Sequence, residues 1–191
     1  FNEKMGILLF PEYIPPTIVG KRYSDLDLFL AKHKHIVLKP LERAGGSGIF
    51  VLKDGDKNKN ALFEAMTVKQ TEYIMAQKYL TEALTLGDKR VVVLNGKILG
   101  AELRVAASDD YRNNIVAGGS SKKTKLTPQE KKMCTKIARR LKEMGIYFAG
   151  LDLIGGCITE INITSPTGLV EVDAHEGLEL EEKVIDFIEN S

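Results

Sequence analysis

The chain has 191 residues, of which 43% are hydrophobic and 28% are charged, and its formal net charge is +1. This composition is typical of a globular protein with one large or two small domains, and the small net charge gives no general attraction to nucleic acid or membranes. No apolar stretch reaches the length of a membrane span, and no signal peptide is recognisable. Two cysteines are too few for a disulfide framework or zinc site, so a cytoplasmic location is expected. Because Phe1 and not Met comes first, we expect a piece of a longer chain or a processed product.

The first part of the chain predicts alternating helices and strands. Asn2 is a candidate cap for a short helix, and residues 11–16 are expected to be extended. Ser24 is expected to cap a helix through about Lys34 that carries Leu26, Phe29 and Leu30 on one face. The next expected elements are a strand over 35–41, a glycine-rich loop over 42–48, a strand over 49–53, a turn at 54–55, a helix over about 59–69 and a strand over 73–80.

The second part predicts two hairpins and two helices. Asn95-Gly96 lies between two apolar runs, which indicates a tight hairpin, and the polar residues 108–124 are expected to form a long loop. Thr127 and Glu130 form a capping box for a helix that ends near Met144. A hairpin symmetric about Gly156, with Ile154 opposite Ile158 and Asp152 opposite Glu160, and a last helix over about 180–188 complete the pattern.

The segment 122–143 is strongly basic, with nine Lys or Arg residues against two Glu. A groove for nucleic acid is one interpretation. However, no aromatic residue alternates with these charges, as a stacking surface for single strands requires. We therefore interpret the segment as a solvated helix face and expect no nucleic-acid partner.

Three oxygen-bearing side chains, Asp152, Glu160 and Asn162, lie in an otherwise apolar, strand-forming segment. The expected hairpin places all three on one sheet face, where two opposed carboxylates repel each other. A cation between them would remove this repulsion, and such a donor set suits Mg²⁺. A protonated or hydrogen-bonded carboxylate pair at a sheet edge is the alternative.

The glycine-rich loop 42–48 lies between two strands, so it lacks the context of a Walker loop or a dinucleotide fingerprint. Such a loop can close over phosphates with backbone N–H donors, and Lys39 just before it can neutralise them. A plain hairpin with a mobile tip explains the loop equally well.

Three arginines, Arg90, Arg104 and Arg112, lie in or after the Asn95-Gly96 hairpin. Arginine binds carboxylate or phosphate with two parallel hydrogen bonds. With residue 90 opposite residue 101, Arg90 and Arg104 are expected to emerge from the same end of the hairpin. Each arginine taken alone is equally consistent with a surface charge.

In combination these motifs resemble the ATP-grasp enzymes, specifically the bacterial glutathione synthetase family. The resemblance rests on VLKP, AGGSGIF, MAQKYL, GDKRVVVL, RNN…AGG, GLDLIG and TEINITSPTG, which occur in this order over essentially the whole chain. It implies an α+β ATP-grasp fold in which two α/β subdomains clamp the nucleotide, a lid subdomain over 1–79 and a core subdomain over 80–191. The family's preceding N-terminal domain is absent from this sequence.

The resemblance implies an ATP- and Mg²⁺-dependent ligase, with Mn²⁺ as an alternative metal. It would join the carboxylate of γ-glutamylcysteine to glycine through an acylphosphate, giving glutathione, ADP and phosphate. Another ATP-grasp carboxylate–amine ligase, or an ATP-binding fragment without turnover, remains an alternative. The implied partners are these small molecules, and neither nucleic acid nor a membrane is expected as a partner. Whether the chain forms a homo-oligomer is left open.

The resemblance also implies roles for individual residues. The residues implied to bind ATP are Lys4, Lys39, Gly45, Gly46, Ser47, Gly48, Gln77, Lys78, Tyr79, Leu80, Asp88 on the ribose side, and Arg104 on the phosphate side. Those implied to act on the reacting groups are Arg90 and Arg112; the implied metal ligands are Asp152, Glu160 and Asn162; and the implied substrate-binding residues are Asn114, Ser165, Thr167 and Gly168. Val170 differs from the arginine that relatives often carry near this position.

Overall fold

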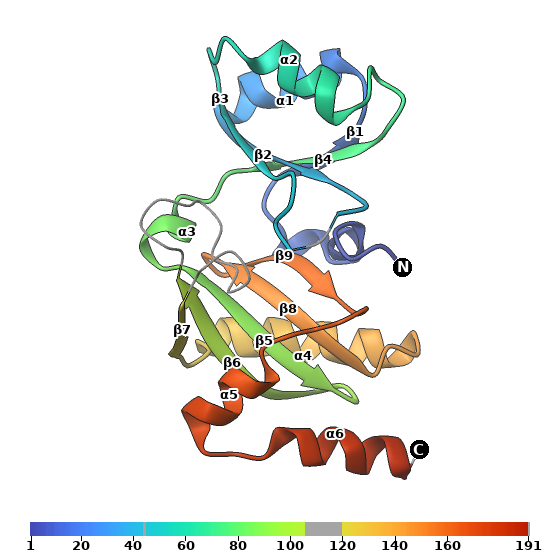
Figure 1. The fold of residues 1–191 in the computed structure, drawn as a ribbon, viewed down its shortest axis with the longest axis vertical. Helices are drawn as coiled ribbons and strands as arrows, with labels where there is room; N and C mark the ends of the chain where they lie inside the picture. The colour runs from blue at the N-terminus through green and yellow to red at the C-terminus, as the bar shows by residue number, and fades with distance from the viewer. Residues whose placement is uncertain (44, 106–119, 191) are drawn as a thin grey trace.

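The computed structural model describes residues 1–43, 45–105 and 120–190 and shows two lobes, each built on an antiparallel sheet (Figure 1). The small lobe has the strand order β1-β4-β2-β3. Its elements are β1 (Thr17–Gly20), α1 (Tyr23–His33), β2 (His35–Pro40), β3 (Phe50–Lys53), α2 (Lys59–Met66) and β4 (Ile74–Lys78). Helices α1 and α2 cover one face of the sheet, where the expected stripe of Leu26, Phe29 and Leu30 is buried against the strands (Figure 1).

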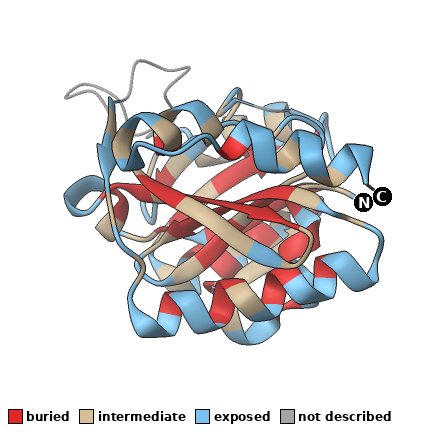
Figure 2. Cartoon of the chain, turned by 90° about the horizontal axis from the view of Figure 1, so that it is seen from below, coloured by how far each residue is buried: buried red, intermediate tan, exposed pale blue. Residues whose placement is uncertain are grey.

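The large lobe has the strand order β7-β6-β5-β8-β9. Its elements are α3 (Glu82–Thr85), β5 (Asp88–Leu94), β6 (Lys97–Val105), β7 (Ser120–Lys123), α4 (Pro128–Glu143), β8 (Phe148–Ile154), β9 (Cys157–Asn162), α5 (Leu169–Glu176) and α6 (Leu180–Glu189). Val91 and Val93 of β5 pack in the cluster that contains α4, whereas Val92 packs with α5 and α6. The two sheet faces are therefore covered by different helices, and Figure 2 shows the buried residues along the strands and the inner side of α4.

Helix α4 begins as its sequence predicts. Thr127 Oγ1 accepts a hydrogen bond from the Glu130 amide at 3.2 Å, and Glu130 Oε2 accepts one from the Thr127 amide at 2.8 Å. Met133, Ile137 and Leu141 recur every four residues and are buried in the large-lobe core. Burying such a side chain contributes roughly 1.5–3 kcal/mol, so this stripe fixes the helix on the sheet.

Several short elements differ from the sequence expectations. Residues 11–16 are not simply extended, because Pro11–Tyr13 forms a 3₁₀ turn after the 3₁₀ helix Met5–Leu9. Strand β1, strand β7 and helix α5 were not expected from the sequence. Ser24 does not cap α1, whose N-cap is Arg22 without a side-chain bond, but Asn2 Oδ1 does accept from the amides of Lys4 and Met5.

Both hairpins of the large lobe contain a bulge that changes the register. The turn of β8 and β9 pairs Ile154 with Cys157, so the expected Ile154–Ile158 pair is wrong. A bulge then follows, and beyond it Asp152 lies opposite Glu160 as expected. In the other hairpin a bulge near Val92 pairs Arg90 with Glu102, so the expected partner, residue 101, is wrong by one.

The N-terminal residues pack onto the large lobe. Ile7 and Phe10 belong to the same buried cluster as Leu151, and the carbonyl of Glu3 accepts a hydrogen bond from the Ile161 amide at 3.0 Å. The division between subdomains at residues 79 and 80 falls between the two sheets, while the lid assignment of residues 1–79 stays a prediction. Within the described ranges, no helix is long and apolar enough to cross a membrane.

Candidate functional site

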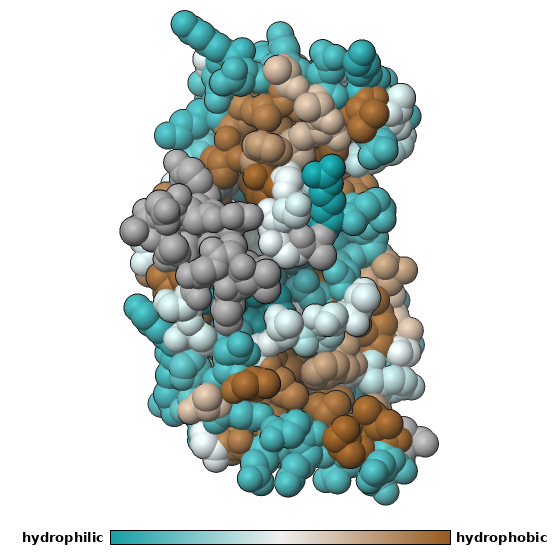
Figure 3. Space-filling view, in the orientation of Figure 1, coloured by the Kyte–Doolittle hydropathy of each residue, from teal (hydrophilic) through white to brown (hydrophobic). Residues whose placement is uncertain are grey.

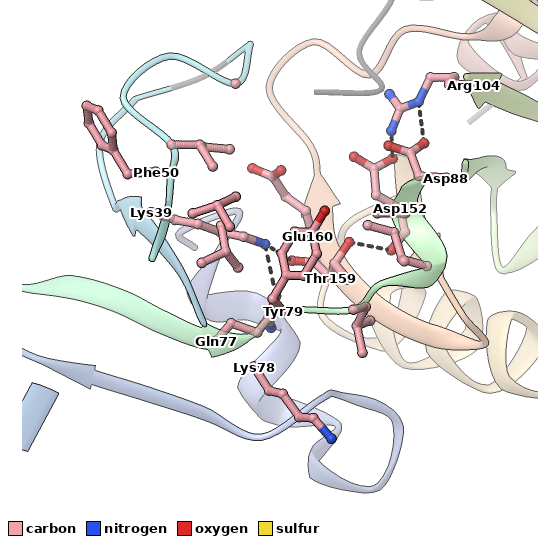
Figure 4. A pocket seen from close by; sticks show the side chains of 17 residues that line it. Lys39, Phe50, Gln77, Lys78, Tyr79, Asp88, Arg104, Asp152, Thr159 and Glu160 are labelled. Atoms are coloured by element: carbon pink, nitrogen blue, oxygen red, sulfur yellow. Dashed lines mark hydrogen bonds and ion pairs between the residues drawn. The ribbon is translucent and has the colours of Figure 1, made fainter. Parts of the chain in front are cut away.

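A cavity of about 390 Å³ lies between the two lobes (Figure 4). Its walls come from β2, β3 and β4 of the small lobe and from β5, β6, β8 and β9 of the large lobe. Ten of the residues predicted from the sequence line it: Lys39, Gly46, Gln77, Lys78, Tyr79, Leu80, Asp88, Arg104, Asp152 and Glu160. The fold therefore brings together side chains as distant in the chain as Lys39 and Glu160.

The small-lobe part of the cavity is largely apolar. Val37, Ile49 and Phe50 line it, and Leu80 and Ala83 contribute from the segment that connects the lobes. Figure 3 shows hydrophobic side chains gathered on this side of the small lobe and mostly polar side chains across the junction. An apolar slot next to a polar end suits a ligand that has a flat ring and a charged tail.

At the polar end, Asp152 lies between two arginines. Arg90 Nε is 2.5 Å from Asp152 Oδ1 and its Nη2 is 3.1 Å from Oδ2, while Arg104 Nη2 is 3.0 Å from Oδ1. Burial alone would raise the pKa of this carboxyl, but the charges of Arg104 and Arg90 outweigh it and hold the pKa at about 2. Asp152 is therefore ionised and orients both guanidinium groups.

The bulge in the β5–β6 hairpin explains why both arginines reach Asp152. It places Arg104 opposite Asp88, two residues from Arg90 on β5 and hence on the same face. With the register expected from the sequence, Arg104 would face the other side of the sheet. Arg90 and Arg104 thus lie near the same end of the hairpin as expected, and the bulge, which was not expected, turns them to the same face.

Asp88 lies inside this charged cluster. Its Oδ1 accepts from Arg104 Nε at 2.6 Å (Figure 4). Burial raises its pKa to about 6; Arg104 opposes this rise and the neighbouring Asp152 adds to it. Asp88 thus contacts Arg104, and the expected roles of Asp88 on the ribose side and of Arg104 on the phosphate side stay predictions.

Two lysines approach the cavity from other directions. Lys39 Nζ donates to Gln77 Oε1 at 3.0 Å and to the carbonyl of Thr159 at 3.4 Å, which connects the lobes. Its burial lowers its pKa, and the charge of Glu160 opposes that effect. Lys4 Nζ is 3.4 Å from Glu160 Oε1 and donates to the Arg43 carbonyl at the start of the glycine-rich loop.

The expected metal ligands lie together on two paired strands. Glu160 is opposite Asp152, and Asn162 Nδ2 donates to Asp152 Oδ2 at 3.1 Å. Among the described residues no group of three or more His, Cys, Asp or Glu side chains forms a ready-made metal site. The donors nevertheless suit Mg²⁺, which is often coordinated by few protein oxygens and completes its coordination with waters and phosphates. To coordinate the ion, Asp152 has to give up one of its contacts with arginine.

The loop over residues 163–168, which was expected to bind substrate and is called the substrate-side loop below, adjoins Arg90 and does not line the cavity. Arg90 Nη1 donates to the carbonyl of Thr167 at 2.9 Å, and Gly168 follows with a φ of +107°. Ser165 is exposed within the same loop. Glu3, which the sequence did not single out, holds the start of the loop because its Oε1 accepts from the amides of Ile163 and Thr164.

Some predicted residues lie elsewhere. In the glycine-rich loop, Gly46 lines the cavity, whereas Gly45, Ser47 and Gly48 are not among its lining residues. Arg112 and Asn114 lie outside the described residues, so their roles stay predictions. Sequence reasoning also missed Glu102, Ser121 and His175, which form one hydrogen-bonded group beside Arg90 and which carry no motif of their own.

Comparison with known proteins gives a consistent result. The family model described as prokaryotic glutathione synthetase, ATP-grasp domain, matches residues 3–177. The glutathione synthetase of Gloeobacter violaceus is 44% identical over 98% of this chain and 57% of its own length, and that of a Nostoc species is 43% identical over 100% and 58%. This chain thus spans somewhat less than two thirds of these relatives. The structure of D-alanine–D-alanine ligase from Bacillus anthracis complexed with ATP shares the fold, with a TM-score of 0.69 at 16% identity over 98% of this chain and 64% of that one.

Proposed function

This chain belongs to the prokaryotic glutathione synthetase family through its ATP-grasp domain, and on that premise we propose that it binds ATP between its lobes and forms an amide bond. The proposed reaction joins the carboxylate of γ-glutamylcysteine to glycine, with ATP converted to ADP and phosphate. We propose the cytoplasm as its location. We also propose that the small lobe, residues 17–78, acts as the lid on a core formed by residues 80–191, with the N-terminal residues packed on that core.

The observation that carries this proposal is the cavity between the lobes, which is apolar at one end and densely charged at the other. The apolar end is suited to adenine, which would lie against Val37 and Leu80. The charged end presents Lys39 and Arg104 to phosphate groups, and Gly46 places the glycine-rich loop at the opening. A nucleoside triphosphate is the common ligand that has a flat ring and three adjacent negative groups.

We propose that Asp152, Glu160 and Asn162 hold Mg²⁺, which would neutralise phosphate charge during transfer. Phosphoryl transfer depends mainly on positioning and on charge stabilisation. Arg90 contributes to both, because Asp152 and the Thr167 carbonyl fix its guanidinium group beside the substrate-side loop. Lys39 and Lys4 would bind phosphate oxygens and at the same time tie the lobes together.

Acyl transfer requires that water stay out. An acylphosphate hydrolyses readily, so the lobes must close over it before the amine arrives. The bond from Lys39 to the Thr159 carbonyl already joins the lobes at the floor of the cavity. We propose that the glycine-rich loop closes the opening opposite this floor.

The direct test is calorimetric titration with ATP, with and without Mg²⁺, followed by a phosphate-release assay. We expect Mg²⁺-dependent binding that becomes tighter with γ-glutamylcysteine, and phosphate release that requires both the dipeptide and glycine. Release with a different amine would favour a related carboxylate–amine ligase. Binding without any turnover would indicate a nucleotide-binding fragment.

The metal assignment has its own test in Glu160→Gln. This variant keeps the side-chain shape but removes one of the two carboxylate charges, so Mg²⁺-dependent ATP affinity should be lost. The exposed Glu143, whose carboxylate pairs with Arg140 on α4, offers a matched Glu143→Gln control. Unchanged Mg·ATP affinity in Glu160→Gln would contradict the proposed metal site.

A further inference from the structure

A partly buried group of three side chains adjoins the proposed site and is not used by the reaction described so far. Ser121 Oγ donates to Glu102 Oε2 at 2.5 Å, and His175 Nε2 lies 2.7 Å from the same Ser121 oxygen. The three residues come from β6, β7 and α5, so the fold assembles them from separate segments. Glu102 is 1% exposed, which makes it one of the most buried charged residues of the large lobe.

The register of the sheet places Glu102 beside Arg90 and Arg104. Glu102 is directly opposite Arg90 on β5 and two residues from Arg104 on β6, so it shares the face that carries both arginines. The two oxygens of its carboxylate lie in different surroundings. Oε2 is held by Ser121, whereas Oε1 lies toward Gly168, where an added methyl group would come within 2.8 Å of it.

We propose that Glu102 binds the acceptor amine and takes up the proton that the amine sheds when the amide bond forms, an assignment that rests on the proposed ligase function. Ser121 and His175 are positioning residues that hold Oε2 so that Oε1 faces the substrate-side loop. A carboxylate here selects an acceptor with a cationic or proton-donating amine.

The chemical step balances with this assignment. The lone pair of the neutral amine forms the C–N bond to the acyl carbon of the acylphosphate. The C–O bond to the phosphate breaks, and its electron pair leaves with inorganic phosphate. The nitrogen then carries one proton too many, and Glu102 Oε1 takes that proton and releases it to solvent after the product leaves.

The electrostatic surroundings of Glu102 favour a proton acceptor of moderate strength. Burial raises its pKa, the bond from Ser121 opposes the rise, and the carboxylate of Glu171 on α5 adds to it. Arg104 and Arg90 lower it, and His175 is one hydrogen bond further away. A carboxylate with a raised pKa takes a proton more readily than an exposed one.

The experiment separates formation of the acylphosphate from its capture by the amine. The native sequence and Glu102→Gln are given ATP, Mg²⁺ and γ-glutamylcysteine, with either glycine or hydroxylamine as acceptor. Hydroxylamine is largely neutral and strongly nucleophilic near neutral pH, so it traps acylphosphates without help from a base. We expect Glu102→Gln to lose on the order of 10²–10⁴-fold in glycine-dependent turnover and to keep most of its hydroxamate formation.

The pH profile gives a second readout. Without a built-in proton acceptor, the glycine-dependent rate of Glu102→Gln should rise steadily with pH as more glycine becomes neutral. Ser121→Ala should lose a smaller part of the glycine-dependent kcat without a change in the KM for ATP, and Ser121→Thr should restore it. Ser120→Ala is the matched control, because Ser120 is the exposed neighbour on the same strand.

Two results would overturn the assignment. An equal loss of turnover with glycine and with hydroxylamine would mean that Glu102 is needed for ATP use or for folding. The ATP affinity of the variant then distinguishes these two causes. Full glycine-dependent activity in Glu102→Gln would show that no proton acceptor is needed there. If the native sequence formed neither glutathione nor hydroxamate, the proposed function itself would fail, and the assignment with it.

Discussion

Asp152 is the side chain on which the charged end of the cavity depends. Its carboxylate bonds to Arg90, Arg104 and Asn162, and together these partners offset the cost of its burial. Removing one partner from a buried ion pair costs roughly 3–5 kcal/mol, because the remaining charge stays desolvated. The geometry of both arginines is therefore coupled to a single residue, and a ligand that draws Asp152 away would also free both guanidinium groups.

The raised pKa of Asp88 predicts how the stability of the protein depends on pH. Its pKa is raised from 3.8 to about 6 by burial, so the folded protein holds this proton more tightly than the unfolded chain does. Its contribution to stability is complete below about pH 4 and is lost as the pH rises through 6. Asp88→Asn has no carboxyl at this position and so does not show this loss. Between pH 4 and 7, the free energy of unfolding of the variant should therefore rise relative to that of the native sequence by up to about 3 kcal/mol.

Urea unfolding of both proteins across this pH range measures the difference. Asp54→Asn is a suitable control, because Asp54 is exposed and its bond to Lys34 lowers its pKa. The control should show no loss of stability between pH 4 and 7 from this group. A constant difference between Asp88→Asn and the native sequence would contradict the raised pKa.

The position of Lys39 predicts that its substitution weakens binding of ATP more than binding of adenosine. Lys39→Met keeps most of the buried side-chain volume but removes the charge, so ATP should bind about 10–100-fold more weakly, as expected for one charge-assisted hydrogen bond. Adenosine affinity should change little, since the apolar slot is intact. Calorimetry with both ligands measures this, with the exposed Lys53→Met as control. Equal losses for ATP and adenosine would place Lys39 against the ring.

At the scale of elements, the sequence predicts best where a motif and a periodic pattern agree. Helix α4 has both, since its capping box and its stripe of Met133, Ile137 and Leu141 are observed. The positions of the strands β2, β5 and β6 also follow from their apolar runs and turns. Such local signals contain enough information because they depend on neighbours in the chain.

What the sequence could not predict depends on register and on distant contacts. A bulge shifts pairing by one residue. Gly100, which pairs with Val92 at the first bulge, is a signal that the expected register did not take into account, whereas the paired positions on either side of the bulge after Asp152 contain no glycine or proline. The position of Arg104 beside Asp152 depends on the first of these. The group of Glu102, Ser121 and His175 is assembled from three elements, so no spacing along the chain could reveal it.

At Gly168, just before α5, the structure predicts that one added methyl group lowers both stability and turnover. Gly168 has a φ of +107°, and a methyl group there would lie 2.8 Å from Arg90 Cγ and 2.8 Å from Glu102 Oε1. Gly168→Ala should therefore lose roughly 1–2 kcal/mol from backbone strain and a further 1–3 kcal/mol from crowding. Turnover should fall as well, because Arg90 must move.

Gly177→Ala is the matched control for this change. Gly177 ends α5 with a φ of +64° and has no atom within 4 Å of an added methyl group, so it carries the strain without the crowding. Urea unfolding and steady-state assays of both variants separate the two effects. Similar stability and activity in the two variants would mean that the loop moves freely away from Arg90.

At the scale of the whole molecule, each lobe has its own buried core. Leu30, Ile36 and Phe63 belong to the small-lobe core, and Ile137 and Leu151 to that of the large lobe. Polar bonds join the lobes around the cavity, including Lys39 to Thr159 and Asn2 to the Leu41 carbonyl. An apolar contact joins them as well, because Met75 of β4 is buried in the large-lobe cluster with Val19 and Leu41 against it. Since this contact is smaller than either core, we expect the lobes to move about it when no ligand is bound.

A ligand that contacts both lobes should therefore couple their stabilities. At a concentration of 100 times its Kd, Mg·ATP should raise the free energy of unfolding by about 2.7 kcal/mol. Hydrogen exchange should show slower exchange in β2 and β4 of the small lobe and in β8 and β9 of the large lobe, because their residues line the cavity together. Adenosine lacks phosphates and should protect mainly the small-lobe strands. Protection by Mg·ATP confined to one lobe would mean that the nucleotide does not bridge the cavity.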